Sequence, residues 1–401
     1  MNVLFLSTWF PTPPDNGARI RVCHLLRALS ARHRVTVLAF NPRGTAAAAR
    51  LCSHAADAAV TLEGVPVDPF RYTDAAWWLK FASPTPLACW PSREMWRRVA
   101  QAARARRWDV VVASQLPVVP YLRLVGKVPA ILDLDAIWTL ETHARFQAAP
   151  SAWQRLRHRL SWHKSRLYEQ YWLTRLAACT VVSPQEQAYL RRLAPRRAAD
   201  IHLCPNGVDC AHNRPDLAPR QPHALVYAGA LTYRANYDAM QSFLRDTYPL
   251  IQAQEPAVSL TITGDTAGVD LGGLQLDESV HLSGYVADVR RPVAAAAVAV
   301  VPLRQGGGTR LKVLEAMALG TPVVATSKGV EGLSLTADEH FLLADTPAAF
   351  AGAVARLLRD PVRARRLACA ARTWVAARYD WTETGARFVR VVETAAAGQP
   401  A

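Results

Sequence analysis

The chain has 401 residues, of which 51% are hydrophobic and 20% charged, and its formal net charge at pH 7 is +15. This length is sufficient for two domains with complete cores, and the composition excludes a disordered or low-complexity protein. No apolar run approaches the roughly 20 residues that a membrane-spanning helix needs, so no such helix is expected.

The excess positive charge lies in the N-terminal half. Residues 1–200 contain 28 Lys and Arg against 13 Asp and Glu, whereas residues 201–401 contain 19 of each. A one-sided basic half predicts an anionic partner, namely a membrane surface, a phosphorylated acceptor or a nucleic acid. Between residues 72 and 175 aromatic residues alternate with the basic ones, for example at Trp162–Lys164, which favours a membrane interface. A solvated basic surface over a tryptophan-containing core explains the same pattern, and both interpretations stay open.

Two further features bear on location and metal binding. The seven cysteines are scattered and form no Cys-x-x-Cys pair, so neither a disulfide framework nor a metal site is predicted. The segment 1–8 lacks the charged start of a signal peptide and is predicted to be a first strand. We expect a cytoplasmic protein, and a peripheral contact with the inner face of the cytoplasmic membrane remains open.

Short apolar runs alternate with longer amphipathic segments from one end of the chain to the other. This alternation is typical of parallel sheets with crossover helices and predicts the α/β class, with two doubly wound domains. The predicted strands are Val3–Leu6, Arg34–Ala39, Asp109–Ala113, Ala130–Leu134, Cys179–Ser183, Ala224–Tyr227, Ser259–Thr263, Val298–Val301 and Pro322–Ala325.

Two carboxylates stand at spacing two where the fourth of these strands ends. Asp133 and Asp135 therefore leave the strand on the same face, at the edge where open α/β sheets bind ligands. Asp-x-Asp holds a divalent ion in transferases of another fold. Without a nearby cluster of further metal ligands, contacts with the hydroxyl groups of a ligand are favoured here. His143 is a candidate for an additional contact.

A cluster of Pro, Asn and Gly between Pro205 and Pro222 interrupts the pattern and predicts a hinge. We therefore expect a first Rossmann-like domain at residues 1–210 and a second at residues 211–375. A last helical segment runs from Thr373 to about Glu393. We expect residues 376–401 to form a helix that packs back on the first domain.

The most informative segment is Gly306–Gly320, in which three glycines precede an amphipathic helix pattern that starts at Leu311. A glycine-rich loop at a helix start aims unpaired N–H groups at one place and binds phosphate. Thr309, Arg310 and Lys312 add a hydroxyl and two cations, which suit a pyrophosphate. One turn later, Glu315 is within reach of a ribose diol. Gly320 is suited to end the helix. An ordinary turn between a strand and a helix is the alternative.

This segment resembles the donor-binding signature of glycosyltransferase family 4, in which Glu-x7-Glu precedes Ala-Met-Ala-x-Gly-x-Pro-Val-Val. Glu315 matches the second glutamate, and Ala316–Val324 follow in register. Gly307 stands in place of the first glutamate, which in the family usually contacts the donor sugar. The chain is more similar to a bacterial branch of exopolysaccharide and exosortase-associated sugar transferases.

The resemblance implies a GT-B fold, in which two Rossmann-like domains face a cleft and a C-terminal helix returns to the first domain. It also implies that residues 1–210 bind the acceptor and that residues 211–375 bind the nucleotide-sugar donor. The family's diphosphate-binding Arg and Lys are replaced by Ala230 and Ala235, so Arg234, Arg310 and Lys312 are the predicted substitutes. The expected donor-binding residues are Gly17, Gly229, Arg234, Gly264, Tyr285, Val286, Gly306, Gly307, Gly308, Thr309, Leu311 and Glu315.

The resemblance implies a catalytic group of Glu315, Arg310 and Lys312, without a metal and without a side-chain nucleophile. Acceptor contacts are expected from Arg19, Asp133, Asp135 and His143. The implied activity is that of a retaining hexosyltransferase. It would move a sugar from a nucleoside diphosphate sugar, UDP- or GDP-linked, to a saccharide or lipid-linked acceptor in polysaccharide biosynthesis.

No cofactor beyond this substrate and no nucleic acid partner is expected. Two other functions remain as alternatives. One is a nucleotide-sugar epimerase of the same fold, and the other is a non-enzymatic protein that binds anionic surfaces.

Overall fold

The structure is a computed structural model that describes residues 1–14, 16–42, 60–70, 86, 91–306 and 308–398. The chain forms two compact units. The first contains Met1–Pro205 and Thr384–Ala401, and the second contains Asn206–Glu383. The chain thus passes from the first unit to the second after Pro205, where the sequence predicts a boundary after residue 210.

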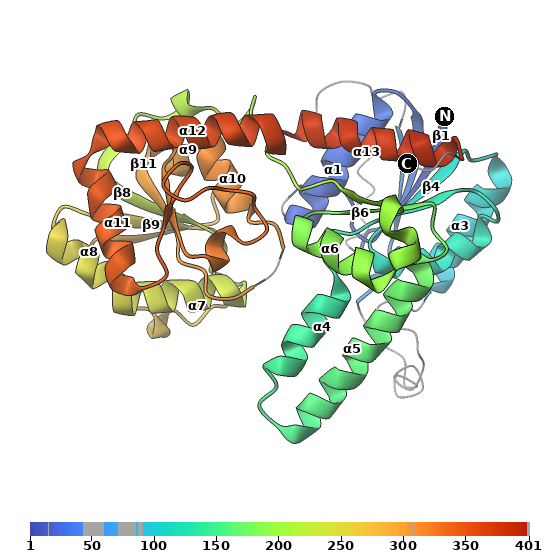
Figure 1. Ribbon diagram of the computed structural model, residues 1–401, viewed down its shortest axis with the longest axis horizontal. Coiled ribbons are helices and arrows are strands. Elements are labelled where there is room, and N and C mark those ends of the chain that lie inside the picture. Colours follow the sequence, from blue (N-terminus) through green and yellow to red (C-terminus); the bar gives the residue numbers. More distant parts are fainter. Residues whose placement is uncertain (15, 43–59, 71–85, 87–90, 307, 399–401) are drawn as a thin grey trace. The chain divides into compact units, whose positions relative to one another are not determined.

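The first unit contains a parallel sheet of seven strands in the order β3-β2-β1-β4-β5-β6-β7 (Figure 1). The strands are β1 (Asn2–Ser7), β2 (Arg34–Phe40), β3 (Val60–Val65), β4 (Val110–Ser114), β5 (Ala130–Asp133), β6 (Ala178–Val181) and β7 (Ile201–Leu203). The helices include α1 (Gly17–Ser30), α3 (Arg93–Ala105), α4 (Trp138–Gln147), α5 (Ala152–Leu173), α6 (Pro184–Leu193), α13 (Trp381–Ala396) and the 3-10 segments η2 (Leu116–Leu124) and η3 (Pro195–Asp200).

Alternating side chains of the central strand β1 pack in two hydrophobic cores, one on each face of this sheet. Leu4 and Leu6 join the core on one face, and Val3 and Phe5 join the core on the other. The second core also contains side chains of α1 and α13, among them Phe388, which is fully buried. The predicted return of the C-terminal helix to the first unit is confirmed.

The second unit contains a parallel sheet of six strands in the order β10-β9-β8-β11-β12-β13. The strands are β8 (Gln221–Ala228), β9 (Ser259–Thr263), β10 (Val280–Gly284), β11 (Ala296–Val301), β12 (Val323–Ala325) and β13 (Leu342–Leu343). The helices include α7 (Arg234–Ser242), η5 (Phe243–Thr247, a π-helical turn), α8 (Tyr248–Gln254), α9 (Arg290–Ala295), α10 (Leu311–Ala318), α11 (Pro347–Arg359) and α12 (Pro361–Tyr379). The 3-10 segments are η4 (Pro215–Leu217), η6 (Leu271–Gly273) and η7 (Lys328–Val330).

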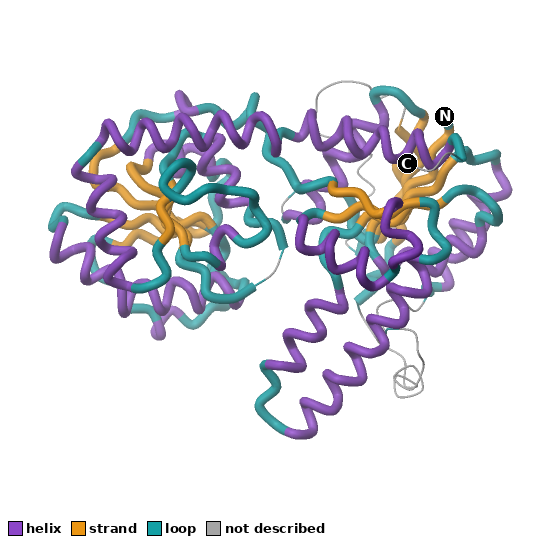
Figure 2. The backbone as a smooth tube through the Cα atoms, in the orientation of Figure 1, coloured by secondary structure: helices purple, strands orange, loops and turns teal. Residues whose placement is uncertain are grey.

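Helices cover both faces of this sheet as well. Leu225 and Tyr227 of β8 join a core with α8 and α11, whereas Val226 between them joins a core with α10 and α12. Figure 2 shows the strands of each unit between helices. The predicted α/β class with two doubly wound parallel sheets is therefore confirmed.

All nine predicted strands are present, with ends that differ by a few residues at most. The last helical segment differs from the prediction, because it is two helices that meet at Asp380. The backbone of Asp380 is extended and forms a bridge with Val208, so the helix is interrupted there. Among the described residues, no helix is both long and apolar enough to cross a membrane.

Candidate functional site

The predicted donor residues lie at the carboxyl edge of the second sheet. From β8 the chain continues outward to β9 and β10, and from the adjacent β11 it continues to β12 and β13 on the other side. The carboxyl ends of β8 and β11 therefore frame the switch point at which open α/β sheets bind ligands. Gly229, Gly264 and Tyr285 directly follow β8, β9 and β10, and the glycine-rich loop follows β11.

The loop after β11 has the backbone that its glycines predict. Gly306 and Gly308 have φ values of +105° and +77°, in the left-handed region that favours glycine. The helix α10 then starts at Leu311. It ends in a Schellman motif, in which Gly320 has a φ of +70° and the N–H of Thr321 donates to the carbonyl of Ala316. The predicted helix end is confirmed, while Gly307 lies outside the described residues.

Arg310 fixes the glycine-rich loop to the segment that follows β12. Its guanidinium is only 6% exposed and donates to the carbonyl oxygens of Lys328 (3.1 Å) and Gly306 (2.9 Å). It also contacts the carboxylate of Glu331 at 3.3 Å. These contacts tie both ends of the loop to the segment after β12. Arg310 therefore shapes the loop in this structure. Because its guanidinium already contacts two carbonyl oxygens and a carboxylate, fewer of its N–H groups are left for the predicted contact with a phosphate.

Lys312 extends from the first turn of α10 toward the end of β8. Its Nζ donates to Tyr227 Oη at 2.8 Å and to Asn236 Oδ1 at 2.9 Å, and it lies 4.1 Å from the centroid of the Tyr227 ring. A Cβ atom built on Gly229 would lie only 2.6 Å from this Nζ. The ammonium therefore sits against the backbone at Gly229, and the glycine is needed for that approach.

The sequence predicts Lys312 as a substitute for the missing family cations, and in the structure its amine lies beside one of the two positions concerned. Asn236, which holds its amine, comes directly after Ala235, one of the two positions that lack the cation. Asn236 Oδ1 also accepts from Tyr227 Oη at 2.7 Å, so strand β8 and helix α7 fix the amine together.

Burial changes the proton affinity of two groups on α10. Burial and, to a smaller extent, the charge of Arg310 lower the pKa of Lys312 to about 7, while Glu315 opposes the shift. Burial raises the pKa of Glu315 to about 7 against the influence of Lys312. An acid and a base that both titrate near neutral pH at a switch point are typical of a functional site.

The other predicted donor residues lie at the same edge with different exposure. Thr309 Oγ1 accepts from Asn206 Nδ2 at 3.1 Å, so Asn206 also supports the glycine-rich loop. Tyr285 is 77% exposed and Val286 is half-buried after β10. Arg234 begins α7, and its side chain is 90% exposed near Asp238.

In the first unit, Asp133 is fully buried rather than open to a ligand. Its carboxylate accepts from Arg21 at 2.5 Å and from Thr180 Oγ1 at 2.6 Å, and Arg21 also donates to the Cys204 carbonyl at 3.0 Å. Arg21 is itself 1% exposed. The predicted Asp133 therefore links α1 to β5 and β6.

Asp135 lies at the carboxyl edge of the same sheet. Burial and the charge of Asp133 raise the pKa of Asp135 to about 6, although Arg21 and a hydrogen bond with Gln115 oppose the shift. Gln115 also accepts from Trp9 Nε1 at 3.0 Å, and the guanidinium of Arg19 lies 5.9 Å from the Trp9 ring. These contacts connect the predicted residues Arg19 and Asp135 across the ends of β1, β4 and β5.

Two other predicted residues of this unit have local roles. Gly17 is the first residue of α1, and the side chain of Asn16 caps this helix by accepting from the N–H of Arg19 at 3.0 Å. His143 lies on α4, where its ring centroid is 4.6 Å from that of Trp162 on α5. The structure therefore places His143 in the packing between α4 and α5.

The sequence analysis missed the residues that position these groups. Tyr227 and Asn236 hold Lys312, and Trp9 and Gln115 connect Arg19 to Asp135. The backbone of Gln115 has a φ of +76° at the end of β4, which is energetically unfavourable for a residue with a Cβ atom. Backbone strain of this kind is frequent at functional sites. Within the described residues, no group of three or more His, Cys, Asp or Glu side chains could hold a metal ion.

Comparisons with known proteins show which family and which folds the chain resembles. The family description "Glycosyl transferase 4-like domain" matches residues 16–207, and "Glycosyl transferases group 1" matches residues 222–360. A phosphatidyl-myo-inositol mannosyltransferase of Mycobacterium leprae (strain TN) is 32% identical over 213 residues. That match covers 49% of this chain and 54% of the mannosyltransferase, so the chain spans about half the length of this relative.

Solved structures extend the likeness over the whole chain. Sucrose-phosphate synthase from Thermosynechococcus elongatus has a TM-score of 0.72 at 20% identity, and the match covers 100% of both chains. Anabaena Alr3699/HepE in complex with UDP has a TM-score of 0.65 at 14% identity, with 98% of this chain and 100% of that chain covered. At these identities the likeness shows the fold alone.

Proposed function

Because the chain belongs to the family 4-like glycosyltransferases of GT-B fold, we propose that it transfers a hexosyl group from a nucleoside diphosphate sugar to a hydroxyl acceptor. The acceptor is a saccharide or a lipid-linked saccharide of polysaccharide biosynthesis. The anomeric configuration of the sugar is retained, as the family resemblance implies.

The observation that supports the proposal most directly is the position of Lys312. Its amine is held at the end of β8, next to the glycine-rich loop and at the switch point of the sheet. Tyr227 and Asn236 take two of the three N–H donors of the ammonium, so one remains for a phosphate oxygen. The backbone N–H groups at the start of α10 point to the same edge.

Each side chain at this edge has a distinct task in the proposed reaction. The acceptor oxygen forms a bond with the anomeric carbon on the same face from which the bond to the diphosphate breaks, and the acceptor proton passes to the leaving diphosphate. Negative charge increases on the diphosphate during this step, and Lys312 stabilises it. Glu315 accepts from the ribose hydroxyls, and Arg310 acts by holding the loop in shape.

The acceptor contact belongs to the carboxyl edge of the first sheet. Of the two predicted carboxylates, Asp133 is already neutralised by Arg21, so we assign the contact to Asp135 together with Arg19. A carboxylate at this position can accept a hydrogen bond from a sugar hydroxyl and orient it. The basic surface of this unit suits an acceptor attached to an anionic membrane.

A thermal-shift panel with UDP, GDP, ADP and their common sugar conjugates, without added metal, tests the donor site. UDP is the first nucleotide to test, because a solved structure of the same fold contains it. Selective stabilisation by one nucleoside diphosphate is expected, and a ligand at a hundred times its Kd adds about 2.7 kcal/mol.

Two variants make this test specific. Lys312→Met should lose the stabilisation, whereas Arg104→Met, which removes an exposed cation of α3 in the first unit, should keep it. Equal, small shifts with every nucleotide in both variants would contradict the donor site. Once a donor is found, the anomeric coupling constant in the NMR spectrum of the product tests retention.

A further inference from the structure

Helix α5 presents large apolar side chains to solvent along one face. Trp153, Leu156, Leu160, Leu167 and Tyr171 are 73%, 51%, 44%, 61% and 42% exposed. Their spacings of three, four, seven and four residues keep them on one side of the helix, over about 27 Å at 1.5 Å per residue. We call these five side chains the apolar stripe.

The opposite face of α5 is the one that packs on the protein. Ser165, Glu169 and Trp172 are buried there. Helices α4 and α5 run side by side (Figure 1), and the Trp162 ring stacks on Phe146 with an interplanar angle of 11°. The Thr139 N–H and hydroxyl also donate to Glu169, which binds α4 to α5. The hairpin is thus internally packed, and the apolar stripe is not its contact with the core.

The charge beside the apolar stripe is all of one sign. Residues 152–168 contain five cations and no Asp or Glu, and Glu169, which follows, is buried on the opposite face. Arg157 follows Trp153 by one turn, and Arg159 and Arg166 lie on the other flank of the stripe. A helix with a Trp and Leu face bordered by arginines is typical of interfacial helices that lie on anionic membranes.

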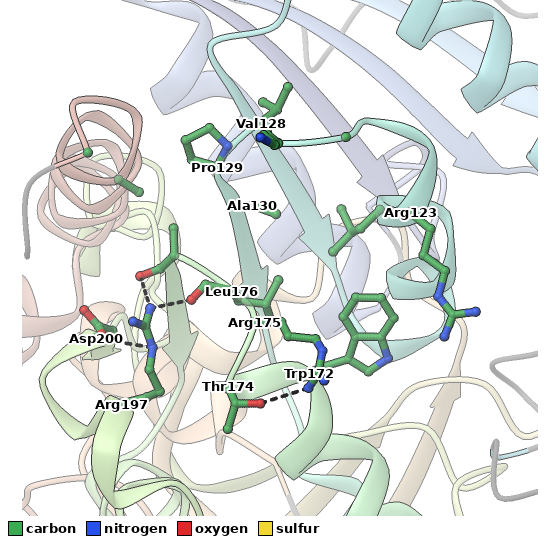
Figure 3. Close-up of a pocket in the computed structure, with 16 residues that line it drawn as sticks. Arg123, Val128, Pro129, Ala130, Trp172, Thr174, Arg175, Leu176, Arg197 and Asp200 are labelled. Atoms are coloured by element: carbon green, nitrogen blue, oxygen red, sulfur yellow. Dashed lines mark hydrogen bonds and ion pairs between the residues drawn. The ribbon is translucent and has the colours of Figure 1, made fainter.

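A basic cavity adjoins the end of the apolar stripe. It has a volume of about 680 Å³, and its lining includes Arg123, Lys127, Thr174 and Arg175 (Figure 3). Thr174 and Arg175 follow Tyr171 by three and four residues and therefore continue the same side of the chain as α5 ends.

The cations of this cavity differ in how far they are engaged. The guanidinium of Arg175 stacks on the Tyr171 ring at 3.6 Å, and that of Arg123 lies 5.7 Å from the Trp172 ring. Arg197 in the same lining is engaged by Asp200 at 3.1 Å and by the carbonyls of Leu176 and Ala177. Arg175 also donates to the Tyr171 carbonyl at 2.9 Å and to Thr174 Oγ1 at 3.2 Å. Among the described residues, no carboxylate pairs with Arg123, Lys127 or Arg175, so their positive charge is available to a ligand anion.

The chemistry of this surface distinguishes among possible occupants. A second copy of the chain would bring two sets of arginines together, which is unfavourable. A nucleic acid would satisfy the arginines but would leave the leucines in water. An anionic bilayer satisfies both, because tryptophan and leucine enter the headgroup boundary while arginines contact phosphates.

We propose that the α4–α5 hairpin docks on an anionic lipid bilayer, with the apolar stripe in the interfacial layer and a lipid phosphate in the basic cavity. This deepens the proposed function, on which it rests for the lipid-linked acceptor, by identifying the side chains that contact the lipid. The membrane contact is thereby assigned to the apolar stripe of α5 and to the basic cavity at the C-terminal end of this helix.

Flotation of the full chain with vesicles tests the proposal in the absence of nucleotide. Binding is expected to vesicles of phosphatidylcholine with 30% phosphatidylglycerol, and not to phosphatidylcholine alone. The double variant Trp153→Ser/Leu160→Ser should bind roughly tenfold more weakly. Replacing Arg123 and Arg175 by Gln should weaken binding by roughly fivefold per cation.

Matched controls lie in the second unit. Val362 is 76% exposed, so Val362→Ser removes an exposed apolar side chain, and Arg365→Gln/Arg366→Gln removes two exposed cations. Both should bind vesicles as the unchanged chain does. Equal binding by all variants, or equal binding to neutral and anionic vesicles, would overturn the proposal. So would a dimer in light scattering that Trp153→Ser/Leu160→Ser dissociates, since a second copy would then be the occupant.

Thermal shift with UDP on the same variants separates this proposal from the proposed function. If the chain floats with vesicles but no nucleotide stabilises it, the proposed donor site is contradicted and the proposed lipid-binding surface is supported. If UDP stabilises the chain but the chain does not float, the donor site is supported and the lipid-binding surface is contradicted. Melting curves without ligand show whether each variant is folded.

Discussion

Lys312 has a pKa that burial lowers to about 7, so its charge depends on pH in the physiological range. A bound diphosphate favours the charged amine and raises this pKa. Binding therefore takes up a proton above pH 7, and UDP affinity should fall by up to about tenfold per pH unit there. Glu315 and Arg310 are the charged groups that influence the pKa of Lys312. Glu315, whose pKa burial raises to about 7, is largely ionised at pH 8.5, and a guanidinium stays charged there.

Isothermal titration calorimetry with UDP at pH 8.5, in two buffers of different ionisation enthalpy, measures this proton uptake directly. Phosphate groups have pKa values of about 6 and no longer titrate at this pH. An observed enthalpy that is independent of the buffer would show that Lys312 does not contact the diphosphate.

Gly229 provides a second test of the same amine. Gly229→Ala would place a Cβ atom 2.6 Å from Lys312 Nζ, so the amine must move away. Because the end of a lysine side chain is flexible, the fold should survive while UDP affinity falls, by roughly tenfold if one charged hydrogen bond is lost. Fluorescence or calorimetric titration with UDP measures the change.

Gly352 is the matched control, because it lies inside α11 and a Cβ atom there would contact nothing within 4 Å. Gly352→Ala should leave UDP affinity unchanged and stabilise the chain by about 0.5–1 kcal/mol, since alanine loses less backbone entropy in a helix. Weaker UDP binding in both variants would point to a general effect on the second unit.

The strands that were not predicted from the sequence are β3, β7, β10 and β13, and all four are edge strands. A central parallel strand is buried on both faces and has a continuous apolar run, as in Val110–Ser114, which makes it visible in the sequence. An edge strand such as Val60–Val65 is partly exposed, and β13 has only two residues. Their pairing depends on neighbours that are distant in the sequence.

The local segments of the candidate site could be predicted from the sequence, but the contacts between distant segments could not. The segment Gly306–Gly320 carries a local pattern, so its loop, its helix and its Schellman end could be read from the sequence. The contacts of Lys312 with Tyr227 and Asn236 join residues that are 85 and 76 positions apart. No local pattern predicts such contacts, because they depend on how α7 and α10 pack against β8.

Asp380 separates α12 from α13, and its carboxylate stabilises the start of α13. It accepts from the N–H of Thr382 at 2.7 Å and from the N–H of Cys210 at 3.1 Å. Burial alone would raise its pKa, but these hydrogen bonds hold the pKa below its ordinary value. Asp380→Ala should therefore cost about 1–2 kcal/mol at pH 7.

The pH dependence of this loss has a defined sign. A carboxylate with a lowered pKa contributes its stability above its ordinary pKa near 4 and loses it as the pH falls further. The difference in melting temperature between the unchanged chain and Asp380→Ala should thus shrink between pH 5 and pH 2. A difference that is constant with pH would mean that the carboxylate charge is not involved.

The first unit is built from two distant parts of the chain, because residues 384–401 belong to it while 206–383 form the second unit. Phe388 of α13 is fully buried in the core that α1 contributes to. Phe388→Ala should destabilise the first unit by about 3–5 kcal/mol through loss of contacts and a cavity. The second unit should keep its stability and its UDP affinity.

Urea unfolding followed by near-UV circular dichroism, with UDP binding measured at each concentration, tests this. The variant should show an early transition that leaves UDP binding intact. A single transition in which structure and UDP binding are lost together would show that the two units unfold as one, contrary to their separate cores.

This discontinuity also determines the order in which the chain can fold while it is synthesised. The apolar face of α1 emerges from the ribosome long before the α13 residues that cover it, such as Phe388 and Val392. The second unit is contiguous and can fold first. Until the last turns of α13 leave the exit tunnel, the first unit has an open core, and a chaperone that binds α1 would protect the nascent chain during that interval.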